Sequence, residues 1–340
     1  MFVVHASRIE RVRVPPSGLA ELCDRLVSAF RWAEPFIAAA FLFIAGYSLV
    51  LSQRGRARRD FLPKILRRVA LLYALSVVLF VPQYGTSFPD LVLSSGILSA
   101  IALAIAMVGL GLVTDRPVAA LLSVALVVLA ATAALDVSGA TVSGLNAGPG
   151  GAFPLVAFAA VGALSARLIH ARGLSALAWS CLGLCLLTLA VWDARLPWLT
   201  ERNSLYPAGS AASVLGALLR GGSPGAALPV AFWNHSAAGA LGLLAPLGVS
   251  LLLVLAAQRA LPGLRLFAPV LLLGRNALLA YVLHLALLGL LDAFELAPQS
   301  PTGTLGLVLL LAVFSCAVGL WLERRASLAS ARARYDRAPA

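Results

Sequence analysis

Four polar side chains interrupt a strongly apolar stretch in the C-terminal part of the chain. Arg275 and Asn276 open the stretch, and Tyr281 and His284 follow within it. Tyr281 and His284 are three residues apart, so they project from a similar face of a helix. Imidazole exchanges a proton near neutral pH, so His284 could act as the general base for acyl transfer to a hydroxyl or an amine. A buried histidine that is only hydrogen-bonded to a neighbouring helix is the alternative interpretation.

The composition explains why these polar groups matter. Of the 340 residues, 61% are hydrophobic and 12% are charged, and the mean hydropathy is +0.94. A soluble domain is about half apolar and about a quarter charged, so we predict a polytopic protein of the lipid bilayer. Polar groups inside hydrocarbon are costly unless they face protein or water, and they therefore mark candidate sites. The net charge of +12 lies mainly in short loops, where it orients a membrane protein and does not indicate a nucleic-acid partner.

Apolar segments recur along the chain, and each is about long enough to cross ~30 Å of hydrocarbon as a helix. None shows the alternation of a spanning β-strand. We therefore predict an all-α transmembrane bundle of about nine helices, at 35–52, 66–82, 91–113, 117–135, 152–170, 174–192, 238–257, 269–291 and 304–322.

We expect these helices to form a single membrane-embedded domain over residues 1–340. Residues 1–31 are predicted to hold the end of a truncated helix and an interfacial segment, in which Leu19–Phe30 is amphipathic. Residues 35–322 form the bundle, and residues 323–340 form a basic cytoplasmic tail. The long segment 192–235 is either a re-entrant piece or a plain surface loop.

Successive predicted loops alternate between loops that carry basic residues and loops that carry none. The loop after the first helix carries seven: Arg54, Arg56, Arg58, Arg59, Lys64, Arg67 and Arg68. The loops at 82–90, 136–151 and 292–303 carry none. Basic loops stay in the cytoplasm, so we predict an external N-terminus and a cytoplasmic C-terminus. The use of Arg for nearly every basic residue is typical of a GC-rich bacterial gene, so we expect a bacterial cytoplasmic membrane.

An external N-terminus that carries Arg8, Arg11 and Arg13 runs against the same rule. A further helix upstream of Met1 would remove the conflict and give ten helices with both ends in the cytoplasm. The oligomeric state stays open, a homo-oligomer included.

The remaining candidates have simpler interpretations. His5 and His235 lie at predicted outer helix ends, whereas we expect His170 to meet lipid headgroups at an inner end. Arg275 could bind a phosphate-bearing ligand or only lipid phosphate. No metal site is predicted, because the four cysteines lack partners at metal-ligand spacing.

Several stretches together resemble one family. Residues 274–284 resemble the late "G-R/M-N-S-L-x-x-Y-V-x-H" helix of heparan-α-glucosaminide N-acetyltransferase-like membrane proteins. Residues 1–6 are similar to the outer end of the family's first helix, and residues 35–49 to its second helix, "P-x-F-x-F-x-x-G-x-S". Residues 96–103 are similar to its "G-V-L-Q-R-I-A-L" stretch, and residues 148–162 to its Gly/Pro helix opening. Ser99 and Ala100 replace the family's Gln-Arg pair, and the Asp and Arg-Gly that open its first helix are absent.

The resemblance implies a multi-pass acyltransferase that takes an acetyl group from cytosolic acetyl-CoA. The acceptor would be a sugar amine or hydroxyl on the outer side. The resemblance places His5 near the acceptor and His284 in the site, and we expect both histidines to be catalytic. Asn276, Tyr281, Arg275 and His235 are expected to bind substrate.

Two other functions fit the same polar residues. A transporter or flippase for an envelope lipid or saccharide would have a closed cavity between similar halves. An enzyme would have a tunnel with a basic inner mouth. A family member that has lost activity is the third alternative.

Overall fold

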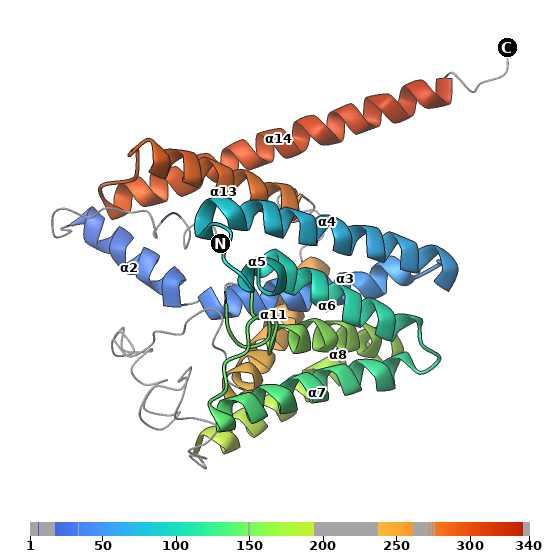
Figure 1. Cartoon of the computed structure of the whole chain (residues 1–340). Helices are drawn as coiled ribbons and strands as arrows, with labels where there is room; N and C mark the ends of the chain where they lie inside the picture. Colours follow the sequence, from blue (N-terminus) through green and yellow to red (C-terminus); the bar gives the residue numbers. More distant parts are fainter. Residues whose placement is uncertain are drawn as a thin grey trace. The chain divides into compact units, whose positions relative to one another are not determined.

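The computed structural model describes residues 6, 18–32, 34–148, 150–193, 237–260, 272, 274 and 276–335. Within these residues every regular element is a helix, which confirms the predicted fold class (Figure 1). The chain divides into two compact units, one of Pro35–Gln258 and one of Met1–Glu34 with Arg259–Ala340. They are called the central unit and the terminal unit below. The single membrane-embedded domain stays a prediction.

The central unit holds the helices that follow one another through the middle of the chain. They are α3 (Glu34–Gln53), α4 (Arg58–Tyr84), α5 (Asp90–Leu93), α6 (Ile97–Val113), α7 (Pro117–Ser138), α8 (Leu155–Asp193) and α11 (Ala237–Ala260). Pro117 at the first position of α7 and Gly139 just past its end, in the left-handed conformation, give that helix sharp limits.

Five helices among the described residues are long and apolar enough to cross a membrane. These stretches are Phe36–Gln53, Pro117–Ser138, Leu155–Leu187, Ala240–Ala260 and Pro301–Arg325, and two shorter apolar helices are Ile97–Val113 and Ala277–Ala293. The protein is therefore an integral membrane protein with a helical bundle.

One predicted helix is interrupted in the structure, and a break between two others lies where it was predicted. The segment predicted at 91–113 is interrupted at residues 94–96, between α5 and α6. There the hydroxyl of Ser94 accepts from the Gly150 amide at 2.7 Å and donates to the Ala147 carbonyl at 3.3 Å. The interruption thus arises from contacts with a distant loop. In α8 the helical path is broken at Gly173, with φ 81° and ψ −175°, as expected from two predicted helices at 152–170 and 174–192.

Close backbone contact joins α3 to α8. A Cβ at Gly46 would overlap the carbonyl oxygen of Ala159, and a Cβ at Gly162 would overlap that of Phe43. Because lipid provides no hydrophobic drive between helices, such close approach through small residues is a main source of their packing energy. These two glycines fix how α3 lies against α8.

The helix ends of the central unit gather at two opposite ends of the unit. One end holds the C-termini of α3 and α6 and the start of α4. The segment from the end of α3 into α4 carries most of the basic residues of the described part of the central unit. At the other end, Ser143 donates to Asp90, and the Ala237 amide donates to Asp136 at 3.0 Å. The loops predicted to share a membrane side therefore lie together, while the side that each end faces stays a prediction.

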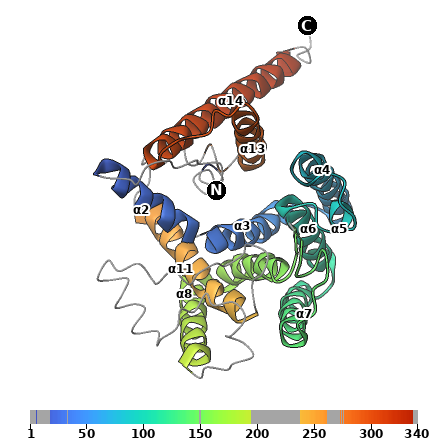
Figure 2. The same ribbon diagram turned by 60° about the vertical axis from the view of Figure 1, so that its left-hand side comes forward.

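The terminal unit contains α2 (Leu19–Trp32), α13 (Ala277–Ala293) and α14 (Pro301–Tyr335). Cys23 and Val27 on one face of α2 are buried, whereas Leu22 and Leu26 are exposed; α2 packs against α14. Helix α13 lies beside α14 in both views (Figure 2). The helix predicted at 304–322 continues to Tyr335, so much of the predicted tail is helical. Within the segment predicted at 269–291, α13 covers Ala277–Ala293, and the described residues Leu272 and Gly274 before it are also helical.

Candidate functional site

A cavity of about 1030 Å³ lies within the central unit, among α3, α6, α7, α8 and α11. Apolar side chains such as Phe43, Leu122 and Leu244 line part of it. Another part, which we call the basic mouth, carries Gln53, Arg54, Arg56, Arg58, Asp115, Arg167, His170 and Arg172. Five guanidinium groups and a single carboxylate make this part strongly cationic. The cavity therefore combines an apolar wall with an anion-attracting one.

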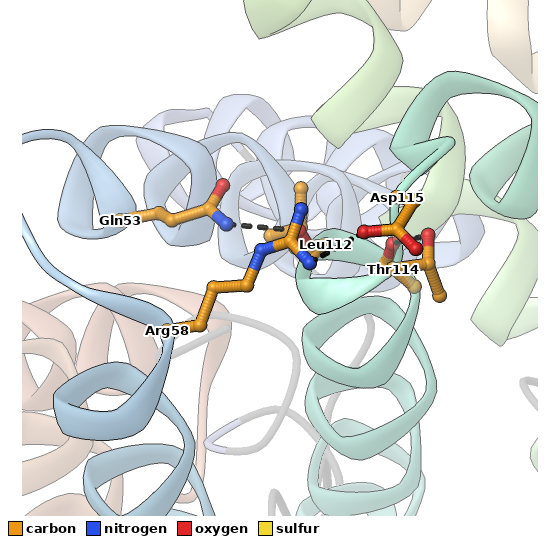
Figure 3. Close-up of polar contacts among 6 residues, drawn as sticks. Gln53, Arg58, Leu112, Thr114 and Asp115 are labelled. Atoms are coloured by element: carbon orange, nitrogen blue, oxygen red, sulfur yellow. Dashed lines mark hydrogen bonds and ion pairs between the residues drawn. The ribbon is translucent and has the colours of Figure 1, made fainter.

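Gln53 holds three helices together at the basic mouth. Its Nε2 donates to the Leu112 carbonyl at 2.9 Å (Figure 3). Its Oε1 accepts from Nη2 of Arg167 at 3.1 Å. The last carbonyls of a helix have no partner within the helix, so Gln53 satisfies one of them at the end of α6. The same amide orients Arg167, which comes from α8.

Arg58 and Asp115 form an ion pair beside this contact, with Nη1 of Arg58 at 2.8 Å from Oδ1 of Asp115 (Figure 3). Their side chains are 59% and 92% exposed. An ion pair this exposed contributes little to stability. Its main effect is to offset one positive charge of the basic mouth.

Arg167 has one nitrogen that the described structure leaves unsatisfied. Its Nε is buried and makes no hydrogen bond, while its Nη2 is bound to Gln53. An unmade hydrogen bond from a buried donor costs about 1–3 kcal/mol, and more for a charged group. A ligand phosphate or carboxylate in the cavity would satisfy this donor, since guanidinium groups match the geometry of such anions.

The terminal unit contains the predicted catalytic histidine. His284 is fully buried, and its Nδ1 lies 2.9 Å from the carbonyl oxygen of Ala280. A carbonyl oxygen can only accept, so Nδ1 carries the hydrogen in the neutral ring and Nε2 carries the lone pair. The ring of Tyr281 meets that of His284 edge-on, with centroids 5.4 Å apart and planes at 77°. These two contacts hold the His284 ring against its own helix.

Asn276 lies at the boundary between α13 and α14. Its Nδ2 donates to the Leu272 carbonyl at 3.1 Å, and a Cβ added to Gly319 of α14 would lie 3.1 Å from that same nitrogen. Asn276 is eight residues before His284, or about 12 Å along a helix. The structure therefore joins Tyr281 to His284 and places Asn276 about two turns away on a similar face.

The other predicted site residues, His5, His235 and Arg275, lie outside the described residues. His170, which was expected among lipid headgroups, lines the cavity. Gln53 was not among the candidate residues predicted from the sequence, and Arg167 was not predicted to belong to a site. Arginine is common at the cytoplasmic ends of membrane helices because of the topology alone. No local sequence pattern distinguishes an arginine that lines a cavity from one that does not.

The apolar helices and their packing define a polytopic α-helical membrane protein. Within this class, the family model described as heparan-alpha-glucosaminide N-acetyltransferase, catalytic, matches residues 23–181. This confirms the predicted resemblance. A comparison with curated proteins found no match, and neither did a comparison with solved structures.

The family match covers most of the cavity wall. It includes Gln53, Asp115 and Arg167 and ends at Cys181, whereas α11, α13 and α14 follow it in the chain. The family is of the acetyltransferase type, so the cationic cavity lies mainly in a segment related to acetyltransferase catalytic domains.

Proposed function

We propose that the protein is a transmembrane acyltransferase. It takes an acetyl group from cytosolic acetyl-CoA and delivers it to an amine or hydroxyl of a saccharide on the outer side of a bacterial cytoplasmic membrane. The observation that supports this best is the cationic cavity in the segment that matches the acetyltransferase family. The N-terminus of the chain would lie outside and the C-terminus in the cytoplasm.

The cavity fits the chemistry of the donor. Coenzyme A carries phosphate groups at one end and the thioester at the end of a long, largely uncharged arm. The unsatisfied Nε of Arg167 and the surrounding guanidinium groups would bind the phosphates. The apolar wall would take the arm. The volume of about 1030 Å³ is at the upper end of the roughly 300–1,000 Å³ typical of ligand pockets.

His284 is the proposed general base. Its Nε2 would take the proton from the acceptor hydroxyl or amine while the acceptor atom forms a bond to the acyl carbon. The bond from that carbon to sulfur then breaks, and the thiolate takes a proton from the imidazolium. His5 is the second proposed catalytic residue. Asn276, Tyr281, Arg275 and His235 are the proposed substrate-binding residues.

Calorimetric titration of the purified protein with acetyl-CoA tests the donor site. We expect binding, and we expect Arg167→Gln to weaken it about 10- to 100-fold because a charge-assisted hydrogen bond is lost. Arg68→Gln is the matched control, since Arg68 is an exposed arginine of α4 outside the cavity lining. Absence of binding by the unmodified protein would overturn the proposal, and equal effects of both substitutions would remove Arg167 from the site.

A transfer assay in proteoliposomes tests the reaction. Labelled acetyl-CoA is supplied on the side of the basic mouth, and saccharides with free amines or hydroxyls are supplied on the other. Label should appear on the saccharide only when both are present. Saccharide that crosses the membrane without becoming acetylated would indicate a transporter instead.

A further inference from the structure

The cavity of the central unit is bounded on one side by apolar side chains that are themselves exposed. Phe43, Leu112 and Leu244 line its inner wall and are buried. Val118 and Leu122 of α7 line it as well, yet they are 48% and 47% exposed. A side chain that both lines a cavity and reaches the outer surface marks a place where the cavity opens. The cavity therefore opens along the start of α7.

This opening lies on a helix that is long and apolar enough to cross the membrane, so its exposed apolar side chains contact lipid. The helix begins at Pro117, soon after Asp115 of the basic mouth. Leu122 is five residues further on, or about 7–8 Å along the helix. Lipid headgroups give way to acyl chains over a depth of about 5–10 Å. An amphiphile of the bilayer could therefore enter here with its charged end at the basic mouth.

The charges of the basic mouth select the sign of such an amphiphile. Five guanidinium groups and one carboxylate line this part of the cavity. The buried Nε of Arg167 makes no hydrogen bond within the described structure. Guanidinium groups match the geometry of phosphate oxygens, and basic pockets between membrane helices hold anionic lipid headgroups. A zwitterionic headgroup would bring an ammonium group against the same arginines, so the mouth favours a lipid with net negative charge.

We propose that the cavity binds an anionic phospholipid that enters from the leaflet at the basic mouth. The lipid phosphate accepts a hydrogen bond from Nε of Arg167, and an acyl chain passes along Val118 and Leu122 onto the apolar wall. This binding needs no acyl transfer and goes beyond the proposed function. Where the proposed function also holds, the lipid and acetyl-CoA use the same guanidinium groups and the same wall. The lipid then competes with the donor, so acetyl transfer responds to the anionic-lipid content of the membrane.

Binding of labelled dioleoyl-phosphatidylglycerol to the detergent-solubilised protein tests the site. We expect saturable binding that unlabelled phosphatidylglycerol displaces and that phosphatidylcholine with the same chains does not. Glycerol 3-phosphate and inorganic phosphate carry the anionic group without chains, and neither should displace the lipid at equal concentration. Displacement by phosphatidylcholine would show unselective lipid contact. Displacement by glycerol 3-phosphate or phosphate would show a plain anion site, and either result overturns this inference.

Substitutions locate the lipid in the cavity. Arg167→Gln should weaken phosphatidylglycerol binding about 10-fold or more, because a charge-assisted hydrogen bond is lost, whereas Arg68→Gln should not. Leu122→Trp places a bulky side chain at the opening and should also weaken binding. Leu126→Trp is its matched control, since Leu126 lies one turn further along α7, is 64% exposed and is outside the cavity lining. Equal binding by the two Trp variants, or unchanged binding by Arg167→Gln, would contradict the proposed site.

Calorimetric titration with acetyl-CoA in mixed micelles separates this inference from the proposed function. With both proposals correct, phosphatidylglycerol lowers the apparent acetyl-CoA affinity and phosphatidylcholine leaves it unchanged. If the protein binds acetyl-CoA and phosphatidylglycerol does not lower that affinity, this inference alone is overturned. If the protein binds phosphatidylglycerol selectively and binds no acetyl-CoA, the lipid site stands and the proposed function is overturned.

Discussion

The side chains of Gln53 and Arg167 are joined by a hydrogen bond of 3.1 Å although 114 positions separate them in the sequence. The bond connects the end of α3 to the first segment of α8 at the basic mouth. It leaves Nε of Arg167 buried and free to donate. Gln53 is therefore a positioning residue for the arginine that we propose binds the donor phosphates.

Replacing Gln53 tests this positioning. Gln53→Met keeps the approximate length of the side chain and removes both of its hydrogen bonds. We expect acetyl-CoA affinity to fall about 3- to 10-fold, as for the loss of one ordinary hydrogen bond. Gln53→Glu should retain the contact with Arg167 but place a negative charge in the mouth, and should also weaken binding. Calorimetry compares the variants, and unchanged affinity for both would contradict the role.

Asp115→Asn should affect binding more than stability. The Arg58–Asp115 pair is exposed, and such pairs contribute roughly 0–1 kcal/mol. We therefore expect the melting temperature to change little. The substitution removes the carboxylate of the basic mouth, so acetyl-CoA should bind somewhat more tightly at low ionic strength and lose this gain in high salt. Weaker binding at low salt would show that Asp115 supports the site.

Gly162→Ala should strongly destabilise the central unit. The new methyl group would overlap the backbone carbonyl of Phe43, and backbone cannot yield as a side chain can. We expect a loss of about 1–3 kcal/mol or more, the usual cost of overpacking. Gly183→Ala in the same helix is the control, because a Cβ there meets no atom within 4 Å. Thermal unfolding in detergent measures both, and equal effects would contradict the close contact of α3 with α8.

His284→Ala should abolish acyl transfer and leave membrane insertion intact. General bases typically contribute about 10²- to 10⁴-fold to the rate, so transfer should fall at least to that extent. Acetyl-CoA binding by the same variant checks that the central unit is preserved. Tyr281→Phe keeps the ring that meets His284 edge-on and should retain most of the activity unless the phenol itself contacts substrate. Normal transfer by His284→Ala would remove this histidine from the mechanism.

Much of the fold follows from the sequence because the membrane constrains it strongly. A helix that crosses hydrocarbon must be long and apolar, so α3, α7 and α11 are evident as runs of such residues. The amphipathic pattern of Leu19–Phe30 likewise predicts α2. The contact of Tyr281 with His284 is local, and the spacing of three residues is enough to predict it.

The sequence by itself thus determined the class of protein, most of its helices, the family and one histidine as a candidate base. Only the tertiary structure decided which faces meet. Hydropathy does not specify how a helix is rotated about its axis, because lipid tails are as apolar as leucine and all faces of a spanning helix can be hydrophobic. The contact of Gln53 with Arg167 and the approach of Gly162 to Phe43 depend on that rotation and on the register between distant segments.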